Sequence, residues 1–108
     1  MKLLTKELKK KLPSLHSRES DGGKAIALVK LFTPDSSWTW YILSWDGEDI
    51  CFGLVDGMER ELGYFSLKEI ESVRGPLGLP VERDLYWEPK TLEEIAPEMF
   101  APVEQSKQ

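Results

Sequence analysis

Leucines recur at helical spacing near the start of the chain. Between residues 4 and 15, four leucines are separated by four, four and three positions, which places them on one stripe of a helix. Thr5 is the predicted N-cap of this helix and Pro13 disturbs its end. The lysines between the leucines face outward: Lys6, Lys9 and Lys10. The pattern predicts a short amphipathic helix packed on a sheet.

Three extended segments follow this helix. Residues 24–32 are apolar and partly β-branched, residues 38–45 are rich in aromatic side chains, and residues 50–55 return after a polar turn. The middle segment is apolar on both faces of its pleat. It therefore predicts a central strand, with Trp40 and Trp45 pointing to opposite faces.

The sequence DGED at residues 46–49 predicts a tight β-hairpin. With Asp46 and Gly47 as the two turn residues, Trp40 lies opposite Gly53. A glycine opposite an indole leaves room for the ring to lie over the neighbouring backbone.

Helix-start signals mark the second half of the chain. After a short strand at residues 62–67, Ser66 and Glu69 have the spacing of a capping box, which predicts a helix over residues 67–73. The same spacing recurs at Thr91, before a last helical turn.

Together these elements predict a single α+β domain over residues 1–95. It contains a small antiparallel meander of three to four strands, an N-terminal amphipathic helix and a short helix near residues 67–73. Residues 96–108 carry few packing side chains and are expected to form a flexible tail. A chain of 108 residues with 41% hydrophobic content is sufficient for one core.

The sequence also indicates a compartment. No run approaches the roughly 18 apolar residues that span a bilayer. The only cysteine, Cys51, is compatible with a reducing cytoplasm. We therefore predict a soluble cytoplasmic protein without a membrane partner.

Charge is distributed unevenly along the chain. The net charge is −5, yet residues 1–12 hold five lysines against one glutamate. An acidic body repels nucleic acid at long range, so the lysine-rich helix is the candidate basic face. Aromatic rings on a sheet can stack on bases if they are exposed, and the candidates are Trp38, Trp40 and Trp45. Direct binding of single-stranded nucleic acid through these features is the alternative function.

Catalytic chemistry is weakly indicated. The acidic cluster within residues 46–61 does not have the spacing of a calcium loop. Cys51 lies in an apolar strand and His16 in a polar loop, which argues against a nucleophile pair. P-loop, dinucleotide and serine-nucleophile motifs are absent from the sequence. We predict no catalytic residue, no metal ligand and no cofactor; a metal-dependent hydrolase or nuclease is the least favoured alternative.

The string RGPLGLPVERDLYW, residues 74–87, contains two glycines and two prolines and predicts a stiff loop. Leu77 and Leu79 are expected to press inward. Arg74 and Arg83, at its two ends, either clamp the loop through carboxylates or turn outward as an anion site.

Five strings carry a family resemblance: MKLLTKEL, FTPDSSWTWY, DGED, ELGYFSL and RGPLGLPVERDLYW. Over Met1 to about Ile95 the chain resembles a family of small bacterial proteins catalogued only as a domain of unknown function. The resemblance implies a setting on plasmids, phages or conjugative elements, beside antirestriction or DNA-processing genes. It implies no activity and no catalytic residue.

The leading hypothesis is a non-enzymatic interaction module that binds a protein or nucleoprotein of a mobile element. The absence of a catalytic motif, the aromatic hairpin and the acidic body support it. The predicted contact residues are Arg74, Arg83, Asp84, Trp40 and Tyr64. The oligomeric state is left open at this point.

Overall fold

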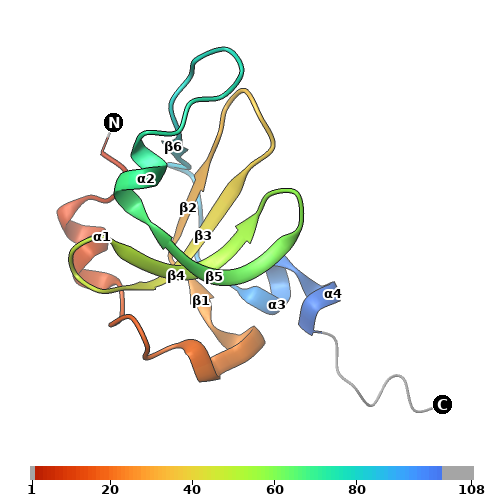
Figure 1. The fold of residues 1–108 in the computed structure, drawn as a ribbon. Coiled ribbons are helices and arrows are strands. Elements are labelled where there is room, and N and C mark those ends of the chain that lie inside the picture. The colour runs from red at the N-terminus through yellow and green to blue at the C-terminus, as the bar shows by residue number, and fades with distance from the viewer. Residues whose placement is uncertain (1, 101–108) are drawn as a thin grey trace.

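A five-stranded antiparallel sheet forms the centre of the molecule in the computed structural model, which describes residues 2–100 (Figure 1). Its strand order is β5-β4-β3-β2-β6. The strands are β2 (Val29–Phe32), β3 (Thr39–Trp45), β4 (Ile50–Asp56), β5 (Arg60–Ser66) and β6 (Glu82–Arg83). The α+β class and the antiparallel meander are confirmed, but the prediction of three to four strands was too low.

The extra strands arise where the expected segment 24–32 divides. β1 (Ile26–Ala27) pairs with β7 (Lys90–Thr91) in a separate two-stranded sheet, while β2 pairs with both β3 and β6. The β1–β7 and β2–β6 pairings each join segments that lie far apart along the chain, whereas β2 and β3 form a local hairpin. Local patterns of apolar residues therefore do not reveal them.

Helices flank the sheet at positions that side-chain caps define. The helices are α1 (Lys6–Lys11), the 3₁₀ helix η1 (Glu19–Lys24), α2 (Leu67–Glu71), α3 (Leu92–Ile95) and α4 (Pro97–Phe100). Thr5 Oγ1 accepts the amide of Leu8 at 3.1 Å, and Ser66 Oγ accepts that of Glu69 at 3.2 Å. A reciprocal capping box forms at Thr91. All three predicted caps are confirmed.

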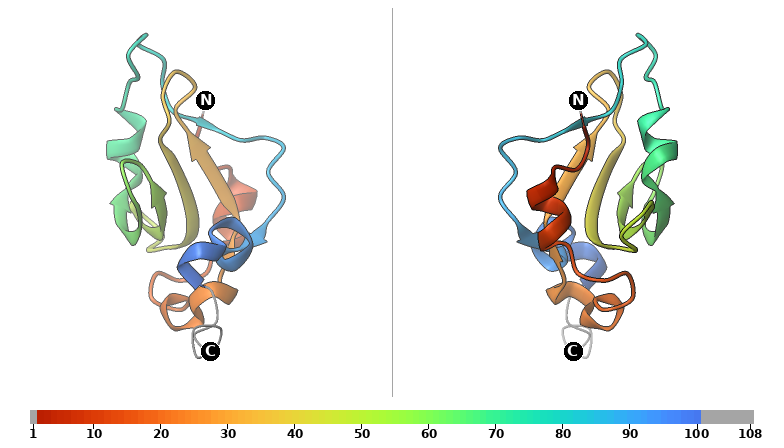
Figure 2. Two further views of the ribbon diagram at one scale, coloured as in Figure 1. Left: turned by 90° about the vertical axis from the view of Figure 1, so that its right-hand side faces the viewer. Right: turned by 90° about the vertical axis from the view of Figure 1, so that its left-hand side faces the viewer.

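Both faces of the central sheet carry a core, as the two-sided apolarity of β3 predicts. The first core contains Trp40 and Ile42 of β3 together with leucines of the N-terminal segment and of α2. The second contains Tyr41 and Leu43 with Leu92 of α3. Figure 2 shows α3, α4 and η1 gathered at one end of the molecule, opposite the β2–β3 hairpin and the loop that follows α2.

The β3–β4 hairpin differs from its predicted register. Trp40 pairs with Val55, and Gly53 lies opposite Ile42, where an added Cβ would come within 1.8 Å of the Tyr41 carbonyl oxygen. The physical reason is a longer turn, in which the carboxylate of Asp46 accepts three consecutive backbone amides.

The two tryptophans of β3 also share a face, contrary to the prediction. The pairing of β3 with β4 shifts between Ile42 and Ser44, and this irregularity breaks the alternation of the pleat. Trp45 therefore joins Trp40 in the first core.

The first part of the predicted tail is helical. Residues Pro97–Phe100 form α4, and Phe100 packs against the second core. The rest of the predicted tail, residues 101–108, lies outside the described residues. Across residues 2–100 the longest α-helix has six residues, so no described helix is long enough to cross a bilayer.

Candidate functional site

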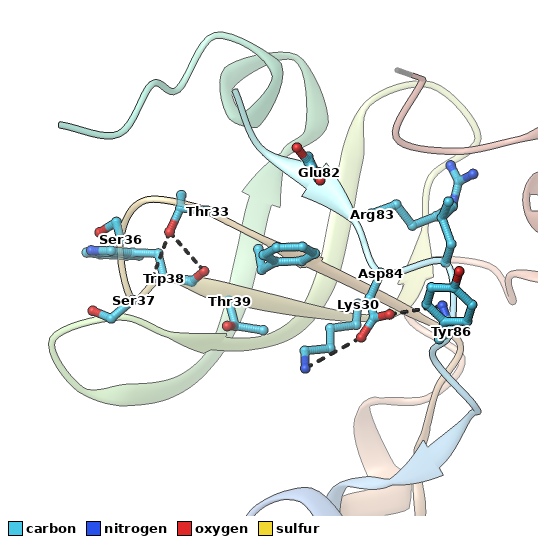
Figure 3. Close-up of a pocket in the computed structure, with 12 residues that line it drawn as sticks. Lys30, Thr33, Ser36, Ser37, Trp38, Thr39, Glu82, Arg83, Asp84 and Tyr86 are labelled. Atoms are coloured by element: carbon cyan, nitrogen blue, oxygen red, sulfur yellow. Dashed lines mark hydrogen bonds and ion pairs between the residues drawn. The ribbon is translucent and has the colours of Figure 1, made fainter. Parts of the chain in front are cut away.

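Trp38 is fixed at the end of the β2–β3 hairpin (Figure 3). Its amide donates to Thr33 Oγ1 at 3.0 Å, and its carbonyl accepts the Thr33 amide at 3.0 Å. On one side the indole lies on Gly57, in the turn between β4 and β5, where an added Cβ would come within 2.4 Å of Trp38 Cζ3. The side chain is still 38% exposed. Trp38 is thus a rigid ring with one open side.

Three cavities adjoin this ring. The first, of about 520 Å³, lies between the β2–β3 hairpin and residues 82–86 (Figure 3). The second, of about 480 Å³, is lined by Met58 and Tyr64. The third, of about 500 Å³, is lined by Trp40, Arg74 and Pro76. Trp38 contributes to the wall of each cavity and so connects them.

We call this region the Trp38 surface. It consists of the cavity-lining residues Trp38, Met58, Tyr64, Arg74, Pro76 and Tyr86. Met58 and Tyr86 are each 93% exposed, and Tyr64 is 51% exposed. Exposed apolar side chains that gather around cavities, rather than singly, are typical of binding surfaces.

The loop at residues 74–80 stands beside this surface and is held by one carboxylate. Asp35 Oδ2, from the β2–β3 loop, accepts the amides of Leu77 at 2.7 Å and Leu79 at 3.4 Å. The loop closes on itself through the amide of Gly75, which donates to the carbonyl of Leu79 at 3.0 Å. The rigid corner that the sequence predicts is therefore present.

The two leucines of this loop do not press inward. Leu77 is 79% exposed and Leu79 is 43% exposed, which corrects the prediction. The side chain of Asp35 occupies the inner side of the loop, against Gly75. The backbone amides face inward to meet it, and the leucine side chains are left on the outside.

Arg74 and Arg83 both bind backbone carbonyls. Arg74 Nη1 donates to the carbonyls of Glu71 at 3.0 Å and Val73 at 2.8 Å, at the end of α2. Arg83 Nη1 donates to the carbonyls of Lys2 at 2.6 Å and Leu3 at 3.0 Å. These contacts with main-chain oxygens hold both side chains against the fold, whereas the prediction named carboxylates for a clamp.

Asp84 shapes the first cavity. Its amide donates to the carbonyl of Lys30 at 2.9 Å, and its carboxylate lies 3.7 Å from the Lys30 ammonium. The same carboxylate accepts the amide of Tyr86 at 2.9 Å and so directs the backbone that carries this exposed ring (Figure 3).

The five predicted contact residues meet only in part. Trp40 and Arg74 line the third cavity, but Trp40 is a core residue with 6% exposure. Arg83 and Asp84 line the first cavity, and Tyr64 lines the second. The residue that joins them, Trp38, was not among the predicted contacts. Its signal in the sequence is a tryptophan next to a turn, immediately before an apolar strand.

Tyr64 is oriented by a polar cluster on its outer side. Its hydroxyl donates to Glu19 Oε2 of η1 and lies 3.3 Å from His16 Nδ1. The hydrogen bond from Tyr64, with a further one from His16, lowers the pKa of Glu19, and the carboxylate in turn raises the pKa of Tyr64. The ring also packs on Phe52, with centroids 5.1 Å apart.

The groups considered for catalysis are buried or make hydrogen bonds that hold turns and helix ends. Cys51 is fully buried, and burial raises the pKa of its thiol to about 12. In the acidic cluster, Asp46 caps its own turn and Asp49 accepts Ser66 Oγ at 2.5 Å and the Lys68 amide at 2.7 Å. Within residues 2–100 no three His, Cys, Asp or Glu side chains are grouped so that they could hold a metal ion.

The features considered for nucleic-acid binding lie apart. α1 presents its lysines outward, and the Lys9 ammonium lies 5.8 Å from the centroid of the Trp45 ring. Trp45, however, is only 9% exposed, so little of its surface is open to a base. The partly exposed Trp38 belongs to the hairpin at the end of the sheet.

Comparison with known proteins gives one match. A family model described as "Protein of unknown function (DUF2958)" matches residues 3–96. No curated protein and no solved structure matches the chain.

Proposed function

The chain belongs to this family of unknown function, DUF2958, and we propose that it is a non-enzymatic module that binds a protein partner through the Trp38 surface. One observation supports the proposal above the others. A partly exposed tryptophan lines three cavities, and the exposed side chains of Tyr86 and Met58 line the first and the second of them.

The residue types of this surface favour a protein partner. Tryptophan, tyrosine and arginine are the residues that most often dominate the binding energy of protein interfaces. Trp38 and Tyr64 are already held by Gly57 and Glu19, so little side-chain freedom is lost on binding. The charged groups beside them, Arg74 and Asp84, are engaged in contacts that maintain the fold. We therefore assign these two charged side chains a structural role and not a role in a reaction.

The proposed setting is the cytoplasm of a bacterium that carries a plasmid, phage or conjugative element. This part of the proposal rests on the sequence strings described above, among them RGPLGLPVERDLYW. The partner is then a protein or a nucleoprotein of that element. A net charge of −5 favours a protein or a basic nucleoprotein over bare nucleic acid.

Copurification from cells that carry such an element tests this function. The chain carries a C-terminal tag, since α4, the last described helix, contributes no residue to the Trp38 surface. We expect one protein to be enriched with the wild type and reduced at least about tenfold with Met58→Asp or Tyr86→Asp, which corresponds to about 1.4 kcal/mol of binding free energy. Both altered side chains are 93% exposed, so folding is preserved.

The matched control is Met99→Asp, on α4, where the side chain is 37% exposed. This variant is expected to recover the partner as the wild type does. Recovery of no specific protein, or equal recovery with all four chains, contradicts the proposal. Treatment of the extract with nuclease separates a protein partner from a nucleoprotein.

Direct binding of single-stranded nucleic acid remains the second candidate, because five lysines lie in the first 12 residues. Tryptophan fluorescence titrated with an oligonucleotide at low and at high salt tests it. Quenching at low salt that disappears at high salt supports this alternative. An unchanged spectrum at low salt eliminates it.

A further inference from the structure

β5 forms an open edge of the central sheet. It is seven residues long, whereas β6 at the opposite edge has two residues. Its pairing with β4 runs without a register shift from Arg60 to Ser66. Residues 62–65 contain neither a charged residue nor a proline. Natural edge strands are usually protected by such residues, by a bulge or by short length, and the centre of β5 has none of these protections.

Two apolar side chains stand exposed along this edge. Leu62 and Tyr64 lie opposite Leu54 and Phe52 of β4, and thus on the face of the second core. They are 39% and 51% exposed. The ring of Tyr64 packs on Phe52, and its hydroxyl donates a hydrogen bond to Glu19. The edge therefore combines an ordered apolar strip with the side of β5 that is not paired with another strand of the sheet.

Gly63 separates these two side chains at the middle of the strand. No atom lies within 4 Å of the position that a Cβ would occupy on Gly63. A glycine in a strand often marks the close approach of another backbone. The centre of the strand is thus flat and accessible on the face opposite Leu62 and Tyr64.

We propose that two copies of the chain associate through β5, in antiparallel register about a two-fold axis at Gly63. In that register Leu62 of one copy lies directly opposite Tyr64 of the second copy, and the reverse pair forms across the axis. Directly opposite residues on one face make the contacts that stabilise a pair of strands. Four side chains, two from each copy, then cover one another, and the two sheets join into one continuous sheet.

Charge is compatible with this register. Within β5, Arg60 would face Ser66 of the second copy and Glu61 would face Phe65, so no two charged side chains of the strand lie directly opposite each other. The two copies of Glu61 are four residues apart along the strands, about 13 Å, which exceeds the screening length at physiological salt. Like charges are therefore kept apart.

Figure 2 shows β5 at the outer margin of the molecule, with α2 continuing from its end. The proposed pairing does not depend on the proposed function, because it is read from molecular mass and from a site-specific cross-link rather than from partner recovery. Leu62, which the test alters, lines the second cavity, and Tyr64 belongs to both surfaces, so the two proposals are tested with different substitutions and different measurements. Failure of one proposal is thus distinguishable from failure of the other.

Light scattering coupled to gel filtration gives the first measurement. For the full chain we expect a mass twice the 12.4 kDa of one copy, with dissociation on dilution. Leu62→Lys places two added charges beside the two-fold axis and is expected to give the single-copy mass. Ile26→Lys, at an exposed residue of β1, is the matched control and keeps the double mass.

A cross-link tests the register. In antiparallel pairs the Cα atoms of opposite residues are about 4.5 or 5.5 Å apart, within the range that a disulfide spans. Gly63→Cys is therefore expected to form a covalent dimer under mild oxidation, while Glu61→Cys is not, because its copies lie too far apart. The native Cys51 is fully buried and does not interfere.

A wild type with the single-copy mass at every concentration overturns the proposal. A double mass that persists in Leu62→Lys also overturns it, since the contact then lies on another surface. A Glu61→Cys cross-link as efficient as that of Gly63→Cys contradicts the register at Gly63.

Discussion

The indole of Trp38 rests on the backbone of Gly57, so closely that an added Cβ would come within 2.4 Å of the Cζ3 atom. This contact joins the β2–β3 hairpin to the turn between β4 and β5. It sets the position of the ring around which the three cavities lie.

Gly57→Ala is expected to displace the Trp38 ring. Overpacking of a fixed contact typically costs about 1–3 kcal/mol of unfolding free energy. Urea denaturation measures the loss, and the tryptophan emission spectrum reports the new position of the ring. Gly63→Ala is the matched control, since its Cβ meets no atom within 4 Å. Equal effects of the two substitutions would show that the contact with Trp38 is not what requires glycine at position 57.

Asp35→Ala is expected to loosen the loop at residues 74–80. The substitution removes the acceptor of the amides of Leu77 and Leu79, and because both hydrogen bonds are exposed the loss costs about 0.5–1.5 kcal/mol. Hydrogen exchange of these two amides should become faster, while exchange in β3 changes only through the global loss of stability. Asp21→Ala, which removes an exposed contact with Arg18, is the control and should cost less than about 0.5 kcal/mol. Unchanged exchange at Leu77 argues that the loop is held otherwise.

Asp46 makes stability depend on acidity. Backbone amides of the hairpin, those of Asp49 and Glu48 first, lower the pKa of Asp46 from its ordinary value of 3.8. Because the folded pKa lies below the unfolded one, the stabilisation is complete above pH 3.8 and is lost as the pH falls through the folded pKa. The free energy of unfolding, measured from neutral pH to below pH 3.8, should show this loss of stability.

Asp46→Asn keeps an oxygen acceptor in the turn but cannot titrate. Its stability should therefore decline less steeply in the same acidic range. If the two chains lose stability in parallel, other carboxyl groups account for the acid sensitivity, among them Glu19 and Asp49, whose pKa values are also lowered.

The thiol of Cys51 is expected to be unreactive in the folded chain. Burial raises its pKa from 9.0 to about 12, and each unit reduces the thiolate fraction about tenfold. A thiol reagent at pH near 8 should react about a thousandfold more slowly with the folded than with the urea-unfolded chain. Rapid reaction of the folded chain would indicate that β4 opens or that the thiol is reachable.

Local signals predicted the elements of this fold well. Thr5, Ser66 and Thr91 each cap a helix through a hydrogen bond within three residues, so a short stretch of sequence contains both partners. Apolar residues on both faces of β3 likewise predict that the strand is buried on both sides. Such features can be predicted because cause and effect lie close together along the chain.

Distant partners account for the errors. Leu77 and Leu79 are exposed because Asp35, more than 40 residues away in the sequence, binds their amides. The hairpin register shifted because a single side chain, Asp46, accepts three amides where a two-residue turn was expected. The Trp38 surface depends on four separate loops and on β5, which only the folded sheet brings together. Composition and residue spacing do not indicate which distant segments come into contact.

The contact between Arg83 and the carbonyls of Lys2 and Leu3 has a consequence for synthesis on the ribosome. Leu3 and the neighbouring Leu4 are buried in the first core, but the guanidinium that secures their backbone is translated 80 residues after Leu3. During synthesis these two leucines therefore stay without this contact until that stretch of chain has been added.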